Sequence, residues 1–294
     1  MTMAALELGL APKGNIKQNR RGRAGWAVYA VLVIGALAMI YPLIWMVLSS
    51  FKSDQEIFSN PAALPTRLDL DNYIQGWTAA TPSFTRYFIN SFAICLGAVI
   101  GNVFACSLVA FAFARLRFPL KGVLFTIMLL TLMLPSHALL IPQYVLYVGL
   151  DWVNTTLPLI VPKFLATDAF FIFLMVQFIR TIPRELDEAA TIDGCGTFAL
   201  FRHIIFPLLR PAIITTIIFT FIWTYNDFFS QLIYLTSPES LTVPVALRSL
   251  VDSSGGAYAQ LLAMSVLSLV PTFVVFLVFQ RRLVEGISTS GIKG

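Results

Sequence analysis

The 294-residue chain is 57% hydrophobic, carries 12% charged residues and has a mean hydropathy of +0.80. Soluble domains contain roughly 25% charged residues, so the composition excludes an ordinary soluble protein and predicts an all-α integral membrane protein. The net charge of +5 does not indicate nucleic-acid binding, because the basic residues lie beside apolar segments instead of forming one basic face.

Residues 1–24 form a basic tail, which we predict to precede the first membrane span. The apolar segment that follows is too long for a signal peptide and lacks a small-residue cleavage site. Six apolar segments are each long enough to cross roughly 30 Å of hydrocarbon as a helix. They occupy residues 26–48, 88–113, 123–145, 157–179, 212–234 and 261–279. The sequence therefore predicts a six-helix membrane domain over residues 25–294.

The positions of lysine and arginine predict the orientation of these spans. Fifteen of the 20 fall in the N-terminal tail, the 114–122 loop, the 180–211 loop and the C-terminal tail, and four fall in the other loops. Cytoplasmic loops of membrane proteins carry an excess of basic residues. We therefore expect both termini and the 180–211 loop to lie in the cytoplasm.

Three charged residues fall within the predicted spans: Lys163 and Asp168 in the fourth, and Asp227 in the fifth. Charges at membrane depth are costly and usually face a cavity or a partner. Counted from the outer ends of their spans, Lys163 and Asp227 lie at a similar depth of roughly 9–11 Å. We expect these two side chains either to form an ion pair or to extend separately toward the outer surface.

The 180–211 loop is polar, acidic and rich in alanine, unlike the spans on either side of it. Pro183 suits a first helical turn, and the three carboxylates within residues 185–188 favour a helix N-terminus. Gly194 favours a break in the helix, and a second amphipathic piece follows and ends near Pro207. The pattern predicts a short helix with a small-residue face that another protein can approach closely.

Aromatic and amide side chains lie within the fifth span, from Trp223 to Asp227. Trp and Tyr commonly anchor membrane interfaces, which is one interpretation. The other is that Trp223 and Asn226 line a sugar pathway, because sugars offer apolar ring faces and hydroxyl groups. In the third span, Pro135 and Pro142 interrupt the helical hydrogen bonds, as either a packing kink or a hinge.

The 180–211 loop resembles the EAA loop of binding-protein-dependent ABC importer permeases. Glu188-Ala189-Ala190, Asp193-Gly194, Phe201 and Pro207 carry this resemblance, with Ile204 and Pro211. Other stretches are similar to the maltose-type (MalG-like) sugar permeases, over the chain from about Trp26 to the end. They include Ser50-Phe51-Lys52, Asn90-Ser91, the run from Ala110 to Arg115, Thr242-Val243-Pro244 and the closing Gly291 to Gly294.

The resemblance implies a type I ABC importer permease fold in a bacterial cytoplasmic (inner) membrane. It implies a coupling role for the EAA-loop residues, with the glutamate contacting an ATPase. It also implies these partners: a second homologous permease, two ABC ATPase subunits that bind ATP and Mg, an external solute-binding protein, and a sugar substrate. Lys163, Asp168, Trp223, Asn226 and Asp227 are the candidate residues of the substrate path.

A different class of function is an ion-coupled secondary transporter that uses Lys163, Asp168 and Asp227 as its relay. Such a carrier would need no ATPase and leaves the polar loop unexplained. An intramembrane enzyme has less support, because the chain contains no HExxH or GxSxG motif. It also contains no GxxxxGK[ST] phosphate loop, so we expect this chain itself to bind no nucleotide. Its three cysteines imply no metal framework, and we expect no metal or cofactor in this chain.

Overall fold

The structure is a computed structural model that describes residues 21–253 and 257–288, and every regular element among them is helical. The longer helices are α1 (Arg21–Ser49), α4 (Phe84–Arg115), α5 (Lys121–Thr131), α6 (Ser136–Gly149), α8 (Ala169–Thr181), α12 (Arg210–Tyr225), α14 (Val243–Ser253) and α15 (Tyr258–Ser288). The shorter ones are α2 (Asp54–Ser59), α3 (Asp71–Ala79), α7 (Leu157–Phe164), α9 (Glu185–Ile192), α10 (Thr197–Leu200), η1 (Phe201–Ile205), α11 (Phe206–Leu208), α13 (Phe229–Tyr234) and η2 (Pro238–Ser240).

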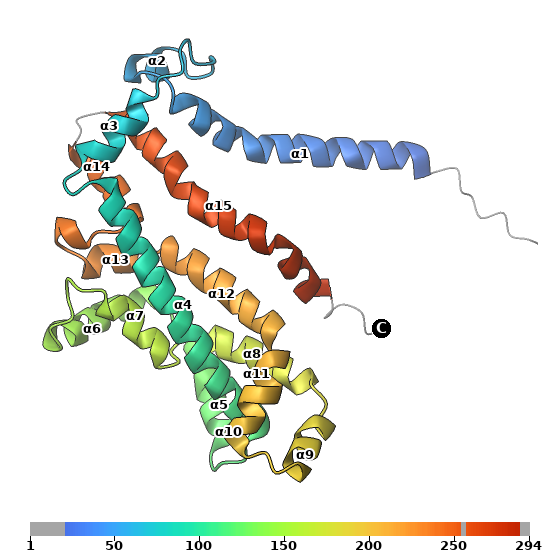
Figure 1. Ribbon diagram of the computed structural model, residues 1–294. Coiled ribbons are helices and arrows are strands. Elements are labelled where there is room, and N and C mark those ends of the chain that lie inside the picture. Colours follow the sequence, from blue (N-terminus) through green and yellow to red (C-terminus); the bar gives the residue numbers. More distant parts are fainter. Residues whose placement is uncertain (1–20, 254–256, 289–294) are drawn as a thin grey trace, which may run out of the picture.

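Helix α4 is the element around which the bundle is built (Figure 1). Its 32 residues extend over roughly 48 Å, and α7, α8 and α12 pack along it. Glycines on α4 allow α7 to approach closely. A Cβ at Gly101 would lie 2.7 Å from the Phe164 ring, and one at Gly97 would lie 2.9 Å from the Ile160 side chain. Small residues at a helix crossing are the usual way for membrane helices to pack without a gap.

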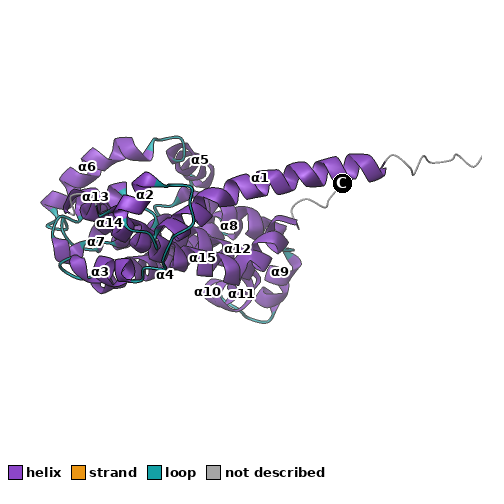
Figure 2. Cartoon of the chain, turned by 90° about the horizontal axis from the view of Figure 1, so that it is seen from above, coloured by secondary structure: helices purple, strands orange, loops and turns teal. Residues whose placement is uncertain are grey.

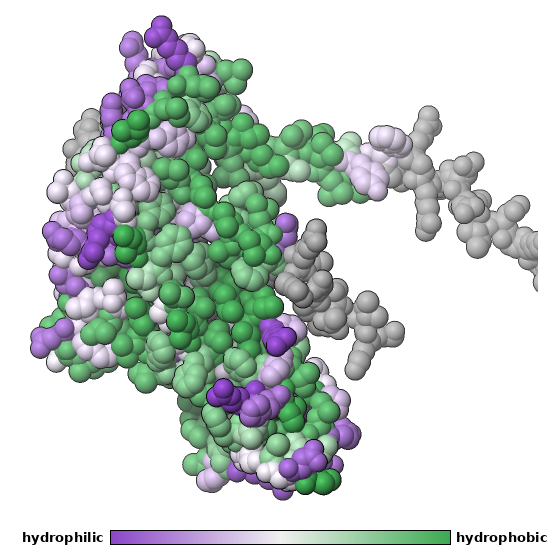
Figure 3. Space-filling model, in the orientation of Figure 1, coloured by the Kyte–Doolittle hydropathy of each residue, from purple (hydrophilic) through white to green (hydrophobic). Residues whose placement is uncertain are grey.

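The two ends of the bundle carry different short helices (Figure 1). Helices α2, α3 and α14 lie at one end, and α9, α10 and α11 lie at the other. Helix α1 projects away from the bundle, as the view from above also shows (Figure 2). None of its most apolar window is buried within the chain, and Figure 3 shows hydrophobic residues along its surface. An apolar helix of this kind is suited to lipid or to another membrane helix.

Three of the six predicted spans are not continuous helices. Residues 123–145 divide into α5 and α6, residues 157–179 into α7 and α8, and residues 212–234 into α12 and α13. Pro135 precedes α6 at the first break, whereas Pro142 lies inside α6 without ending it. Four segments of the described chain are long and apolar enough to span a membrane, or five if a pair of helices bent by 73° counts as one. Six spans and the orientation of the termini remain predictions.

Candidate functional site

The predicted short helix in the polar loop is α9, which joins α8 to the α10–α12 segment (Figure 1). Its first turn contains Glu185, Asp187 and Glu188, whose charges complement the positive end of the helix dipole. Gly194 follows with φ +82, a conformation that glycine adopts without a steric penalty. The Cys195 N–H donates to the Ala190 carbonyl at 2.9 Å and closes the helix end. The carboxylates lie in the first turn and the helix ends before Gly194, as expected, whereas Pro183 precedes the Arg184 N-cap and lies outside the first turn.

The alanine face of α9 is divided between the protein interior and the surface. Glu188, Ala189 and Asp193 are exposed, as is Gly194. Ala190, by contrast, is 4% exposed and packs inside the chain. The surface that α9 offers to another protein is therefore centred on Glu188 and Ala189.

Phe201 anchors the loop to α4 instead of facing outward. Its side chain is 7% exposed, and its ring centroid lies 5.3 Å from that of Phe111 on α4. Phe201 begins the π-helical turn η1, which directly precedes the α11 segment containing Pro207. A proline has no N–H to continue the α-helical pattern, so a widened turn next to it is physically reasonable. Phe201 and Pro207 thus shape the loop from within.

Sequence reasoning did not identify the residue that ties α9 to α4. Arg115, at the end of α4, has Nε 2.9 Å from Asp187 Oδ2, and its Nη2 donates to the Ile182 carbonyl at 2.7 Å. The Arg115 side chain is 5% exposed, and that of Asp187 is 18% exposed. The guanidinium group therefore joins α4 to both the start of the loop and the first turn of α9.

Basic residues gather at the same end of the bundle. Lys121 Nζ donates to the Leu116 carbonyl at 2.7 Å. Desolvation, followed by the positive charges of Arg180, Arg184 and Arg117, lowers the pKa of Lys121. Arg180 also lies over the Phe125 ring, 5.5 Å from its centroid. Residues from three separate loops and helix ends thus place positive charge at the α9 end of the bundle. An excess of Lys and Arg is what the positive-inside rule associates with cytoplasmic loops.

The sequence did not predict that two large apolar side chains beside α9 are exposed. Ile192, the last residue of α9, is 86% exposed, and Phe198 on α10 is 67% exposed. Both belong to a segment whose other exposed residues are mostly polar (Figure 3). We call Glu188, Ala189, Ile192 and Phe198 the α9 surface. Its mixture of an acidic residue and apolar side chains is typical of a protein contact.

The five candidate path residues converge on one cavity of about 780 Å³. The cavity lies between the α6, α7–α8 and α12–α13 segments. Its lining includes Lys163, Asp168, Trp223, Asn226 and Asp227, together with Gln143, Phe170, Phe229, Ser230 and Tyr234. The breaks in the fourth and fifth spans make this possible, because Asp168 and Asp227 both sit where one helix ends and the next begins.

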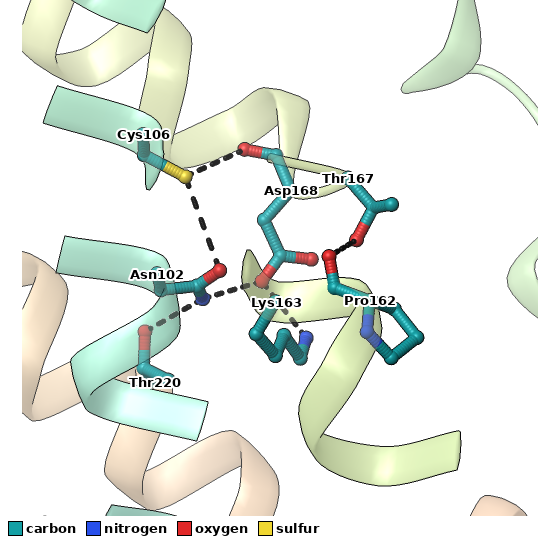
Figure 4. Close-up of polar contacts among 7 residues, drawn as sticks. All are labelled: Asn102, Cys106, Pro162, Lys163, Thr167, Asp168 and Thr220. Carbon is teal, nitrogen blue, oxygen red and sulfur yellow. Dashed lines mark hydrogen bonds and ion pairs between the residues drawn. The ribbon is translucent and has the colours of Figure 1, made fainter. Parts of the chain in front are cut away.

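Lys163 pairs with Asp168 and not with Asp227, so neither of the two alternatives, an ion pair with Asp227 or separate extension toward the outer surface, describes Lys163 (Figure 4). Lys163 Nζ lies 2.8 Å from Asp168 Oδ2, and the two side chains are 27% and 26% exposed. A continuous helix would place residues five apart on different faces. Ala166, with φ +55 at the break between α7 and α8, turns the chain so that they meet. Asp227 Oδ1 instead accepts the Ser230 N–H at 3.1 Å.

Asn102 on α4, which sequence reasoning missed, completes this cluster (Figure 4). Asn102 is fully buried, and its Nδ2 donates to Asp168 Oδ2 and, at 3.0 Å, to Thr220 Oγ1 on α12. Asn102 thereby links α4, α8 and α12 at one level of the bundle. An amide in an otherwise apolar segment was the available signal, because a buried amide needs hydrogen-bond partners.

Neither the α9 surface nor the cavity has the side chains of a metal centre. No group of three or more His, Cys, Asp or Glu residues that could hold a metal ion occurs in the described part of the chain. The described cysteines are free thiols, and Cys95 and Cys106 are buried within the bundle.

Comparisons with known proteins place these features in a family. The family described as "Binding-protein-dependent transport system inner membrane component" matches residues 93–285. The arabinooligosaccharides transport system permease protein AraQ of Halalkalibacterium halodurans is 33% identical over 272 residues, which are 92% of this chain and 96% of that protein. The trehalose/maltose transport system permease protein MalG of Thermococcus litoralis is 31% identical over 271 residues, or 90% and 96% of the two chains.

A solved structure has the same fold. The crystal structure of a bacterial ABC transporter involved in the import of the acidic polysaccharide alginate contains a chain that superposes with a TM-score of 0.77. The match covers 89% of this chain and 97% of that chain at 23% identity. The fold is therefore that of a type I ABC importer permease. Since the matched residues extend from α4 into α15 and include α9, the chain belongs to the family of binding-protein-dependent transport system inner membrane components.

Proposed function

We propose that this chain is the membrane-spanning permease subunit of an ATP-driven importer of oligosaccharides. The observation that carries the proposal is the exposed α9 surface, held between α8 and α12 at one end of an apolar bundle. The family membership and the similarity to permeases named for arabinooligosaccharide and trehalose/maltose transport support the same conclusion. The chain itself performs no catalysis, and ATP hydrolysis belongs to partner subunits.

Movement passes from an ATPase to the spans through α9. Arg115 connects α9 to α4, and Phe201 packs on α4 from the other side of the Gly194 break. An element fixed at both ends to the central helix transmits a displacement better than a flexible loop does. When the ATPases close, α9 moves with them and rocks the bundle between inward-open and outward-open states. Glu188 and Ala189 make the contact, and Asp193, Gly194 and Pro207 set the shape of the loop.

The complete importer consists of this chain, a second homologous permease, two ATPase subunits that bind ATP and Mg, and an external solute-binding protein. It resides in a bacterial cytoplasmic membrane, with the α9 end facing the cytoplasm. The cavity between α6, α7–α8 and α12–α13 is this chain's half of the substrate path. Trp223 and Asn226 offer it an aromatic face and an amide, both of which suit a sugar.

Charge reversal at Glu188 tests the proposal. The chain is expressed with the two ATPases and the second permease, and ATPase co-purification is measured. ATP-driven oligosaccharide uptake is measured in proteoliposomes supplied with the solute-binding protein. Glu188→Lys is expected to lower both by at least about tenfold, since a reversed charge at a protein contact costs about 1.4 kcal/mol or more. Glu239→Lys is the matched control, because Glu239 is also exposed but lies in η2, far along the chain from α9.

The control variant is expected to retain the ATPases. Normal ATPase binding and uptake in the Glu188→Lys complex would refute the coupling role of α9. Uptake that followed an ion gradient without any ATPase subunit would refute the importer itself.

A further inference from the structure

The acidic and basic residues that line the cavity are one cation and two carboxylates. The cation, Lys163, is already paired with Asp168 at 2.8 Å. The second carboxylate, Asp227, accepts the Ser230 N–H at the start of α13. Among the lining Asp, Glu, Lys and Arg residues that the structure describes, none is a cation available to a ligand. The cavity therefore has a slightly negative character.

The Lys163–Asp168 pair is held in place by buried groups. Asp168 Oδ2 accepts both Lys163 Nζ and the Nδ2 of Asn102, which is itself fixed by Thr220 (Figure 4). Asn102 and Thr220 are 0% and 1% exposed. A Cβ at Gly101 would lie 3.0 Å from the backbone carbon of Lys163, so α7 sits against α4 without spare room. Lys163 cannot leave Asp168 for a ligand without abandoning a carboxylate that stays close to it.

The remainder of the lining suits uncharged sugar rings. Trp223 is 50% exposed, and its ring lies 5.5 Å from Phe170 and 5.6 Å from Phe219, centroid to centroid. The aromatic neighbours fix the indole in position, so that one part of it is available to the cavity. Gln143, Asn226 and Ser230 add neutral polar groups. Hydrophobic and aromatic walls with a few neutral polar groups bind uncharged ligands.

We propose that the substrate is an uncharged oligosaccharide, and that Asp168, positioned by Asn102, is the residue that makes this chain's half of the path reject uronate oligosaccharides. The inference rests on the proposed function and specifies the substrate class of the same cavity. A uronate chain carries a carboxylate on every ring. In this cavity it would face Asp227 and would find Lys163 neutralised, and burying an unpaired carboxylate is costly.

Matched pairs of sugars test the inference on the whole complex of both permeases and the ATPases. The pairs are β-1,4-mannopentaose with its mannuronate counterpart, and α-1,4-linked galactose pentamers with galacturonate pentamers. Binding is measured by calorimetry at pH 8, where histidine is ordinarily uncharged, because His137 also lines the cavity. In the unaltered complex, the neutral member of at least one pair is expected to bind at least about tenfold more tightly than its uronate.

Two substitutions separate charge from folding. Asp168→Asn frees Lys163 and is expected to shift the ratio of uronate to neutral affinity by about tenfold toward the uronate, which equals about 1.4 kcal/mol. The double variant Lys163→Met with Asp168→Asn removes both charges and should return the ratio to its original value. The double substitution isolates this chain's contribution from that of the second permease. Asp151→Asn, at an exposed position outside the cavity, should leave the ratio unchanged.

Each of several results would overturn the inference: tighter binding of the uronates by the unaltered complex, binding of neither member of any pair, an unchanged ratio in Asp168→Asn, or a double variant that behaves like the single one. If the Asp168→Asn complex does not assemble, the ratio of neutral to uronate affinity in the unaltered complex still tests whether the substrate is uncharged. ATP-driven uptake by the same complex reports separately on the importer. Uptake that prefers uronates would refute the charge inference and leave the proposed function intact.

Discussion

At the scale of single residues, buried polar and small side chains decide how the helices meet. Asn102 and Arg115 each join α4 to other elements, Asn102 through its hydrogen bond to Thr220 and Arg115 through its hydrogen bond to the Ile182 carbonyl. Gly101 acts by the absence of a side chain, since it allows the end of α7 to reach α4. These contacts are specific enough for single substitutions to test them.

Gly101→Ala should destabilise the bundle by about 1–3 kcal/mol, because the added methyl group would overlap the Phe164 ring and the backbone of Lys163. Gly122→Ala is the control, because nothing lies within 4 Å of a Cβ at that position and alanine favours the helix. Thermal unfolding of the solubilised complex measures both. Equal transition temperatures for the two variants would show that α7 does not press on α4.

Arg115 and Asp187 should stabilise the fold more as a pair than the sum of their separate contributions. Arg115→Ala leaves Asp187 and the Ile182 carbonyl without this partner and should cost about 2–3 kcal/mol, since the pair is mostly buried. In a double-mutant cycle with Asp187→Ala, the two substitutions should be non-additive by about 1 kcal/mol, as measured by unfolding. Additive effects would mean that the ion pair does not hold α9 to α4.

At the scale of elements, local sequence signals predicted the ends of α9, whereas the breaks in the fourth and fifth spans were not predicted. The start and end of α9 followed from its carboxylates and Gly194, all of which act within one or two turns. Neither alternative considered for Lys163 included Asp168 as its partner, because depth was counted along straight helices. The break at Ala166 depends on packing between α7, α8 and α4, which one stretch of sequence does not reveal. The same limitation applies to the break between α12 and α13.

Gly194 ends α9, and its substitution should act on coupling. Alanine at φ +82 is strained by about 1–2 kcal/mol, so Gly194→Ala should change the angle of the loop and lower ATP-driven uptake several-fold. Gly196→Ala is the matched control, because Gly196 has φ −72 and open space around its Cβ. Uptake assays on the two complexes separate these cases. An equal loss of uptake in both would indicate a general need for glycine in the loop.

At the scale of the whole molecule, composition and patterning predicted an all-helical membrane protein, and the family resemblance predicted the fold, which the comparisons confirm. They did not predict the hydrogen-bonded cluster of Asn102, Lys163, Asp168 and Thr220, because its members lie in α4, α7, the break between α7 and α8, and α12. The exposed apolar residues of the α9 surface were missed for another reason. Periodicity alone does not distinguish Ile192, which is 86% exposed, from the buried Ile205.

Photo-crosslinking at the α9 surface tests most directly whether an ATPase docks there. p-Benzoylphenylalanine is placed at Ile192, and in a separate variant at Leu64, which is 71% exposed in the loop after α2 at the opposite end of the bundle. After illumination of the assembled complex, mass spectrometry identifies the adducts. An ATPase adduct at position 192 and none at position 64 is the predicted result. An ATPase adduct at position 64 with none at position 192 would contradict the coupling role of α9.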